Sequence, residues 1–265
     1  MPSKLVQDVL SSLTADKDWP ENVVLYKSLE EQELLPDVAR CYAIEALLAI
    51  HGLQDGFSTC RRQNAESMSP KNGKLPFLRI RNKVVAEDDV IEYLQQKEFV
   101  LHGDRSVEEN LSIKGVMSLL ETKLVPIELY SIWEDAKNVP ETLKRYGYNQ
   151  PKPLHQILCY RKRQEVREFL RVAGYLTKSE DQLSKELEQI FTLLARKLEK
   201  SKYISGEQVS EADVYVFGHL QAIMESKLPN NILLNTLQHF PKLTNFCLNF
   251  NQVHLGHQAM LWEFV

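Results

Sequence analysis

The sequence lacks the long apolar runs that membrane-spanning helices need. No stretch in its 265 residues approaches the roughly 18 apolar residues that mark a transmembrane helix. The N-terminus carries Lys4 and Asp8, has no hydrophobic signal core, and lacks the Arg-rich, acid-poor composition of a matrix-targeting peptide. We therefore expect the protein to stay in the cytosol and to reach a membrane only through a partner or a surface.

An excess of positive charge and the common catalytic motifs are also missing. The net charge of −4, together with the lack of basic stretches interleaved with aromatics, excludes a nucleic-acid-binding protein. There is no Cys-x-x-Cys pair, no glycine-rich phosphate loop and no nucleophile elbow. The cysteines give no metal or disulfide signature, and Cys41 and Cys159 lie in apolar helical patterns that predict buried free thiols.

The first part of the chain alternates strand-like and helix-like patterns. A strand, helix, strand unit followed by an antiparallel hairpin and a helix is the thioredoxin-like layout. Pro76 opens the strand that leads into the hairpin, and a cis peptide bond there is a hypothesis beside an ordinary trans proline. The hairpin is expected to turn at Asn82 and Lys83. The strand-like runs are 23–26, 57–60, 75–80 and 84–85, and the helical patterns are 38–50 and 87–96.

From Asp104 onward the strand patterns stop and helical patterns replace them, which predicts an all-α bundle. Pro126 is expected to kink the first helix. Residues 138–153 contain three prolines and one glycine and are expected to form an irregular connection. The helical patterns cover 105–137, 152–174, 179–200, 210–227 and 231–250.

One local motif connects the two halves to a known architecture. Ser210 and Asp213 can form a reciprocal cap, a capping box with Asp in place of Glu, before the apolar run that starts at Val214. Following a thioredoxin-like half, this motif matches the capped helix at the core of glutathione-transferase C-terminal domains. The sequence therefore predicts a glutathione-transferase-like fold, with an α/β thioredoxin-like N-terminal domain and an all-α C-terminal domain.

The predicted division of the chain has four parts. Residues 1–18 form an amphipathic helix that either packs on the body or acts as a detachable arm. Residues 19–103 form the thioredoxin-like domain and residues 104–250 the helical domain. Residues 251–265 form a tail in which Trp262 and Phe264 are apolar enough to dock on another surface.

The position where a thiol-activating group is expected has few suitable side chains. A glutathione transferase lowers the pKa of a bound thiol with a Tyr or Ser hydroxyl, or a Cys, near the end of the first strand or the start of the first helix. The segment 34–37 offers none of these, and Tyr26 on the strand is interpreted as a core aromatic. Glu87 and Asp88 stand where transferases carry an acidic residue followed by Ser, so that Asp88 would repel the ligand's carboxylate.

Histidines give no metal site either. His254 and His257 could share a helix face, but no third ligand accompanies them. His219 lies in an apolar helix and is interpreted as a core histidine. We therefore predict no catalytic, cofactor-binding or metal-binding residue.

One segment has an unusual charge. Residues 152–178 carry seven Lys or Arg residues and two Glu residues, giving +5 and leaving −9 for the rest of the chain. A solvated helix face is the plain interpretation. The alternative is a surface for anionic lipid head groups or for an acidic partner. The residues proposed for that contact are Arg161, Lys162, Arg163, Arg167 and Arg171.

Four segments in the same order resemble the metaxin family, and the resemblance spans roughly residues 19–250. The likeness is closest to the paralogue that lacks a C-terminal membrane anchor. The segments are WPENVVLY (19–26), NAESMSPKNGKLPF (64–77), RYGYNQPKPLHQILCYRKRQEV (145–166) and DVYVFGHL (213–220).

This resemblance implies a transferase-like fold without transferase activity, held peripherally on the cytosolic face of the mitochondrial outer membrane. It implies a heterodimer with the membrane-anchored paralogue and association with the sorting and assembly machinery and its β-barrel assembly channel. A link to the mitochondrial Rho GTPase and to kinesin motors is also implied, whereas a cofactor is not. The leading hypothesis is a non-catalytic subunit in protein import and β-barrel assembly; the alternatives are a glutathione-dependent transferase and a peripheral lipid-binding protein.

Overall fold

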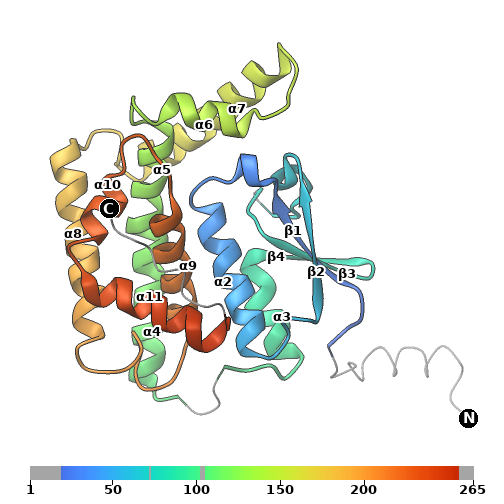
Figure 1. Cartoon of the computed structure of the whole chain (residues 1–265), viewed down its shortest axis with the longest axis vertical. Coiled ribbons are helices and arrows are strands. Elements are labelled where there is room, and N and C mark those ends of the chain that lie inside the picture. Colours follow the sequence, from blue (N-terminus) through green and yellow to red (C-terminus); the bar gives the residue numbers. More distant parts are fainter. Residues whose placement is uncertain (1–18, 72, 102–104, 257–265) are drawn as a thin grey trace, which may run out of the picture.

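The computed structural model describes residues 19–71, 73–101 and 105–256, which fold into two packed halves (Figure 1). The predicted helix at 1–18 and the tail residues His257, Trp262 and Phe264 lie outside the described residues. The elements of the first half are β1 (Val23–Ser28), η1 (Glu30–Gln32), α2 (Asp37–Ile50), β2 (Phe57–Arg62), η2 (Ala65–Met68), β3 (Phe77–Ile80), β4 (Lys83–Ala86), η3 (Glu87–Asp89) and α3 (Val90–Gln96).

The four strands of the first half form one mixed sheet. Its order is β2-β1-β3-β4, with β1 parallel to β2 and antiparallel to β3, and with β3 antiparallel to β4. Because side chains alternate along a strand, Val23 and Leu25 join the core shared with α2, while Tyr26 lies in a small cluster on the other face. The predicted thioredoxin-like half is confirmed.

The hairpin between β3 and β4 turns one residue earlier than predicted. Arg81 has a φ of 52°, in the left-handed region, and Lys83 already belongs to β4. The Leu75–Pro76 peptide bond is cis, and β3 begins at the next residue, Phe77. Pro76 therefore stands just before the strand, where its missing N–H costs no ladder hydrogen bond.

The second half is a helical bundle, as predicted, and Figure 1 shows it lying along α2. No helix among the described residues is both long enough and apolar enough to cross a membrane. The elements are α4 (Val107–Leu119), the π-helical turn η4 (Leu120–Leu124), α5 (Val125–Trp133), α6 (Val139–Tyr146), α7 (Leu154–Val172), α8 (Glu180–Lys197), α9 (Glu211–Glu225), α10 (Ile232–Leu237) and α11 (Pro241–His254).

Two predictions for this half are wrong, and proline position explains both. Residues 138–153 are not wholly irregular, because α6 forms within them with Pro140 in its first turn, where no intrahelical N–H bond is lost. The single helix predicted at 231–250 is two helices, because Pro241 begins α11 as a new helix. The irregularity expected near Pro126 appears as the π-helical turn that precedes α5.

The two halves meet along a seam of small residues between α2 and α9. A Cβ added at Gly218 on α9 would lie 2.2 Å from the backbone oxygen of Ala39 and 2.9 Å from the backbone nitrogen of Ala43 on α2. The two backbones therefore approach so closely that only glycine fits at this position. Next to it, His219 Nδ1 lies 2.7 Å from Glu128 Oε1, and both side chains are buried.

Candidate functional site

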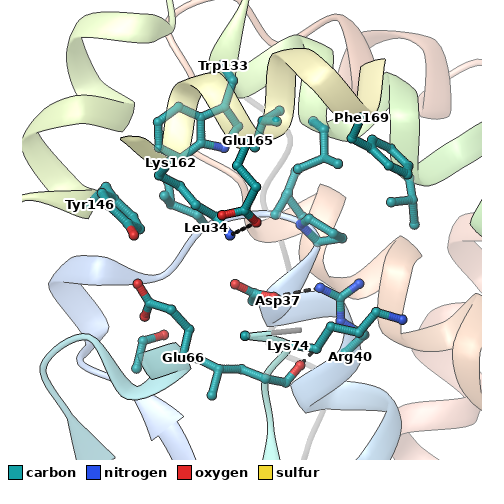
Figure 2. Close-up of a pocket in the computed structure, with 18 of the residues that line it drawn as sticks. Leu34, Asp37, Arg40, Glu66, Lys74, Trp133, Tyr146, Lys162, Glu165 and Phe169 are labelled. Atoms are coloured by element: carbon teal, nitrogen blue, oxygen red, sulfur yellow. Dashed lines mark hydrogen bonds and ion pairs between the residues drawn. The ribbon is translucent and has the colours of Figure 1, made fainter. Parts of the chain in front are cut away.

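A cavity of about 210 Å³ lies between the two halves, beside the end of β1 and the start of α2 (Figure 2). The helical half contributes an apolar wall that includes Trp133, Val166 and Phe169. The first half contributes polar groups. The charged lining residues are four carboxylates, Asp37, Glu66, Glu121 and Glu165, and three cations, Arg40, Lys74 and Lys162.

Each cation that lines this cleft forms an ion pair with a carboxylate. Arg40 Nη2 lies 2.6 Å from Asp37 Oδ1, and Lys162 Nζ lies 2.7 Å from Glu165 Oε1. Lys74 Nζ lies 3.0 Å from Asp88 Oδ1. Each cation already faces a carboxylate, so the cleft has no positive charge left over to attract an anion such as glutathione.

The carboxylate at the start of α2 opposes a bound thiolate. The N-terminus of a helix stabilises negative charge, and in α2 Asp37 already occupies the first turn. A thiolate placed beside it would meet a like charge in a partly desolvated cleft. Cys41, one turn further along α2, is buried, and burial raises the pKa of its thiol, so it stays protonated.

Tyr26 does not line the cleft. Its ring stacks on Phe77 with the ring centroids 4.8 Å apart, in the cluster with Ala65 and Leu75. The hydroxyls among the described lining residues are those of Ser28 and Tyr146. Burial raises the pKa of the Tyr146 phenol, and the negative charge of Glu66 raises the pKa further, so this hydroxyl is poorly placed to stabilise an anion. Figure 2 shows these two side chains facing one another.

Ser28, like Tyr146, is a lining residue with a hydroxyl that sequence reasoning missed. It ends β1, two positions after Tyr26, and its side chain is nearly buried at the edge of the cavity. The signal that could have found it is its position at the strand end, where the chain leaves the sheet and a hydroxyl can face the cleft. An insertion follows it, because η1 and the segment up to Pro36 separate the strand from α2.

This insertion ties the first half to α6. Gln32 Nε2 donates hydrogen bonds to Asn64 Oδ1 at 2.9 Å and to the carbonyl oxygen of Tyr146 at 3.0 Å. Gln32 Oε1 accepts from the Asn64 backbone N–H at 3.0 Å. The loop that lengthens the path from β1 to α2 therefore also fixes the helix that carries Tyr146 into the cleft.

Glu87 and Asp88 contact other protein groups instead of lining the cavity. Tyr215 Oη on α9 donates to Glu87 Oε1 at 2.6 Å, so this carboxylate lies in the interface between the halves. Burial raises the pKa of Glu87 to about 7, even though the charge of Arg40 lowers it. Asp88 holds Lys74, as described above. Glu87 Oε2 is buried without a hydrogen-bond partner among the described residues, and neither Glu87 nor Asp88 is among the residues that line the cavity.

The basic residues proposed for an anionic contact are largely neutralised by neighbours. Arg163 Nε and Arg167 Nε lie 3.5 and 3.7 Å from Glu134 Oε1. Lys162 pairs with Glu165 within α7, and Arg171 Nη2 lies 2.6 Å from Glu168 Oε1. Arg161 is exposed and makes no ion pair with any described residue.

Ser210 and Asp213 form the reciprocal cap at the start of α9. Ser210 Oγ accepts from the Asp213 N–H at 3.4 Å, and the Ser210 N–H donates to Asp213 Oδ2 at 2.9 Å. The Ile204 N–H adds a bond to Asp213 Oδ1 at 2.6 Å. Burial raises the pKa of Asp213 to about 6. These contacts are structural, since they hold the helix that forms the seam.

The remaining polar candidates are dispersed. His254 Nε2 lies 3.2 Å from Tyr203 Oη, and its proposed neighbour His257 is outside the described residues. No group of three or more His, Cys, Asp or Glu side chains suited to a metal ion occurs within 19–71, 73–101 and 105–256.

Known proteins resemble this chain in sequence over nearly all of it. It is 34% identical to human metaxin-2 over 253 residues, which cover 94% of this chain and 95% of that protein. A metaxin-2 homolog of Caenorhabditis elegans is 27% identical over 84% of this chain and 96% of that protein. Mouse metaxin-1 is 32% identical over 66% of this chain and 58% of that protein.

Family models and solved structures agree with this similarity. Residues 41–163 match a family described as outer mitochondrial membrane transport complex protein, and residues 187–250 match the glutathione S-transferase C-terminal domain. Glutathione transferase F7 from Populus trichocarpa superposes with a TM-score of 0.54 at 12% identity, over 86% of this chain and 93% of that chain. A glutathione transferase family member from Pseudomonas fluorescens gives 0.54 at 15% identity, over 92% and 93%. At these identities the structures show the fold alone.

Proposed function

The chain belongs to the metaxin family, and we propose that it is a non-catalytic subunit of a protein-import complex at the mitochondrial outer membrane. The observation that carries this proposal is the near-full-length similarity to human metaxin-2. The match of residues 41–163 to the outer mitochondrial membrane transport complex family supports the same location. The test is fractionation of cells that express the tagged full chain, followed by alkaline extraction, which should release it from mitochondrial membranes as a peripheral protein.

The partner proposed is a membrane-anchored paralogue of the metaxin-1 type. The similarity of this chain to metaxin-1 as well as metaxin-2 supports pairing between two related folds. A stable heterodimer would bury at least about 1,000 Å² in total. Mixing the two purified proteins should give one species of summed mass in size-exclusion chromatography with light scattering. Separate elution at micromolar concentration would contradict the pairing.

The charge of the cleft supports the non-catalytic part of the proposal. Asp37 occupies the helix start where a thiolate would bind, and the lining cations are already paired. Isothermal titration calorimetry with glutathione is expected to show no binding in the millimolar range, and an electrophile assay is expected to show no turnover.

A glutathione-dependent transferase is the second candidate, favoured by the shared fold and by the Ser28 hydroxyl at the end of β1. Ser28→Ala separates the two candidates. If the wild type conjugates glutathione to an electrophile and Ser28→Ala loses that activity, the chain is an enzyme and the non-catalytic proposal fails.

Two finer roles belong to the same proposal. The first is the assembly of β-barrel proteins, through contact with the assembly channel of the sorting and assembly machinery. The second is organelle transport, through the mitochondrial Rho GTPase and kinesin. Depletion of the chain should slow insertion of newly made β-barrel precursors into isolated mitochondria in the first case. In the second case it should reduce the movement of mitochondria along microtubules while leaving that insertion unchanged.

A further inference from the structure

The connection between α6 and α7 lies in a stretch without any acidic residue. Residues 142–164 contain no Asp or Glu. Six cations lie in it, namely Lys144, Arg145, Lys152, Arg161, Lys162 and Arg163. A chain with a net charge of −4 therefore concentrates positive charge in one short segment.

Neighbouring carboxylates account for only part of this charge. Lys144 and Arg145 pair with Glu141. Lys162 and Arg163 have the partners described above. Lys152 and Arg161 are both exposed, and neither makes an ion pair with a residue in the described part of the chain.

Exposed large apolar side chains lie close to these two cations along the chain. Ile157 is 51% exposed and Tyr160 67% exposed, and Leu154 and Tyr148 are exposed as well. Leu154, Ile157 and Arg161 follow at spacings of three and four, which places them on one face of α7. We call the set Tyr148, Lys152, Leu154, Ile157, Tyr160 and Arg161 the α6–α7 tip.

The tip is the outermost part of the molecule at one end. Figure 1 shows the turn between α6 and α7 projecting beyond the bundle at the top of the view, on the side of the first half. A partner helix would need a groove, whereas a projecting surface with apolar side chains, tyrosines and unneutralised cations suits a flat anionic interface. Tyrosine fits there because its ring enters the apolar boundary while its hydroxyl stays in water.

We propose that the α6–α7 tip contacts an anionic phospholipid surface directly. Lys152 and Arg161 lie against the lipid phosphates, and Leu154, Ile157 and Tyr160 enter the boundary between head groups and acyl chains. This inference rests on the proposed location at a membrane, and it adds a lipid contact to the attachment through a protein partner. Two such cations give weak, salt-sensitive binding, so the tip would orient the subunit rather than anchor it.

Vesicle flotation of the purified full chain tests the proposal. The probes are vesicles of phosphatidylcholine alone and vesicles in which about one-fifth of the lipid is phosphatidylserine. The wild type is expected to float with the anionic vesicles at low salt and to be released at high salt. Lys152→Glu/Arg161→Glu is expected to lower partitioning by at least about tenfold, and Leu154→Ser/Ile157→Ser is expected to lower it as well.

Matched controls lie elsewhere on the molecule. Val107 and Leu111 on α4 are 75% and 64% exposed. Figure 1 shows α4 reaching the lower end of the view, opposite the turn between α6 and α7. Val107→Ser/Leu111→Ser should therefore leave flotation unchanged. Lys114→Glu/Lys185→Glu reverses two exposed charges outside the tip and should lower flotation much less than the tip reversal.

A wild type that does not float, or tip variants that float as well as it does, would overturn the proposal. The metaxin-1-type paralogue provides an independent readout. If the tip variants lose flotation but still bind the paralogue, the lipid contact stands. If they float normally and lose the paralogue instead, the tip is a protein-docking surface. If the wild type itself does not float but still binds the paralogue, the lipid inference alone has failed and the proposed pairing stands.

Discussion

Replacing Gly218 with alanine tests the close contact on which the two-halved architecture depends. In the present seam the backbone of α9 touches the backbone of α2, because Gly218 has no side chain. The added Cβ would lie 2.2 Å from the oxygen of Ala39 and 2.9 Å from the nitrogen of Ala43. The optimal van der Waals separation of non-bonded heavy atoms is about 3.5–4.0 Å. Both obstructing atoms are backbone atoms, so no side chain can rotate away and the helices must separate.

The magnitude follows from two opposing effects. Overpacking a buried contact costs about 1–3 kcal/mol, and sometimes more. Alanine inside a helix is more favourable than glycine by about 1 kcal/mol. The clash involves two backbone atoms and lies at the upper end of this range, so we expect Gly218→Ala to lower the free energy of unfolding by about 2 kcal/mol.

Gly115 in α4 provides a control in which the same substitution has the opposite sign. A Cβ at Gly115 would meet nothing within 4 Å. Gly115→Ala should therefore raise the free energy of unfolding by about 0.5–1 kcal/mol. Urea denaturation of the two variants and the wild type, followed by circular dichroism, measures the difference. If Gly218→Ala were as stable as Gly115→Ala, the seam would have room that the structure does not show, and the reasoning would be refuted.

Three further predictions concern buried polar groups. His219→Ala leaves the fully buried Glu128 carboxylate without its partner. Urea denaturation should show that the free energy of unfolding falls by about 3–5 kcal/mol, whereas His219→Leu/Glu128→Leu, which replaces both partners, should recover most of the loss. The pKa of Glu87 is raised from its ordinary 4.5 to about 7, so the folded state binds more protons than the unfolded state between these values and stability falls as pH rises through them. Glu87→Gln should remove up to about 1.4 kcal/mol of that fall per pH unit, and equal pH slopes for variant and wild type would contradict this. Gln32→Ala removes the bonds to the carbonyl of Tyr146 and to Asn64, and it should cost about 1–3 kcal/mol and speed hydrogen exchange in α6; unchanged exchange there would contradict it.

The helices and strands could be predicted from the sequence wherever the local signals, such as caps and apolar periodicity, agreed. The apolar pattern of 38–50 gave α2, and the Ser210 and Asp213 spacing gave the start of α9, because a cap and a periodicity are both set within a few residues. Apart from the one-residue shift of the β3–β4 turn, the errors fell at Pro140 and Pro241. A proline interrupts a helix or begins one depending on whether a helical turn precedes it, and neighbouring packing decides that.

The candidate site was harder to predict from the sequence, because its groups come from positions far apart along the chain. The hydroxyl of Tyr215 reaches Glu87 from 128 positions away, and Gln32 reaches Tyr146 from 114 positions away. Sequence reasoning predicted a core position for Tyr26, and the structure places its ring in a cluster outside the cavity lining. Sequence reasoning did not find that Ser28 and Tyr146 line the cleft, because neither lies in a motif that identifies the side chain's direction.

The sequence by itself determined the two-part layout, the strand and helix order of the first half and the cap of α9. Each of these depends on the properties of residues close together along the chain. The tertiary structure alone decided the charge of the cleft, the close seam at Gly218 and the exposure of the α6–α7 tip. Those properties depend on which groups folding brings together and which it leaves in water, and burial and pairing then set the free energy of every charge.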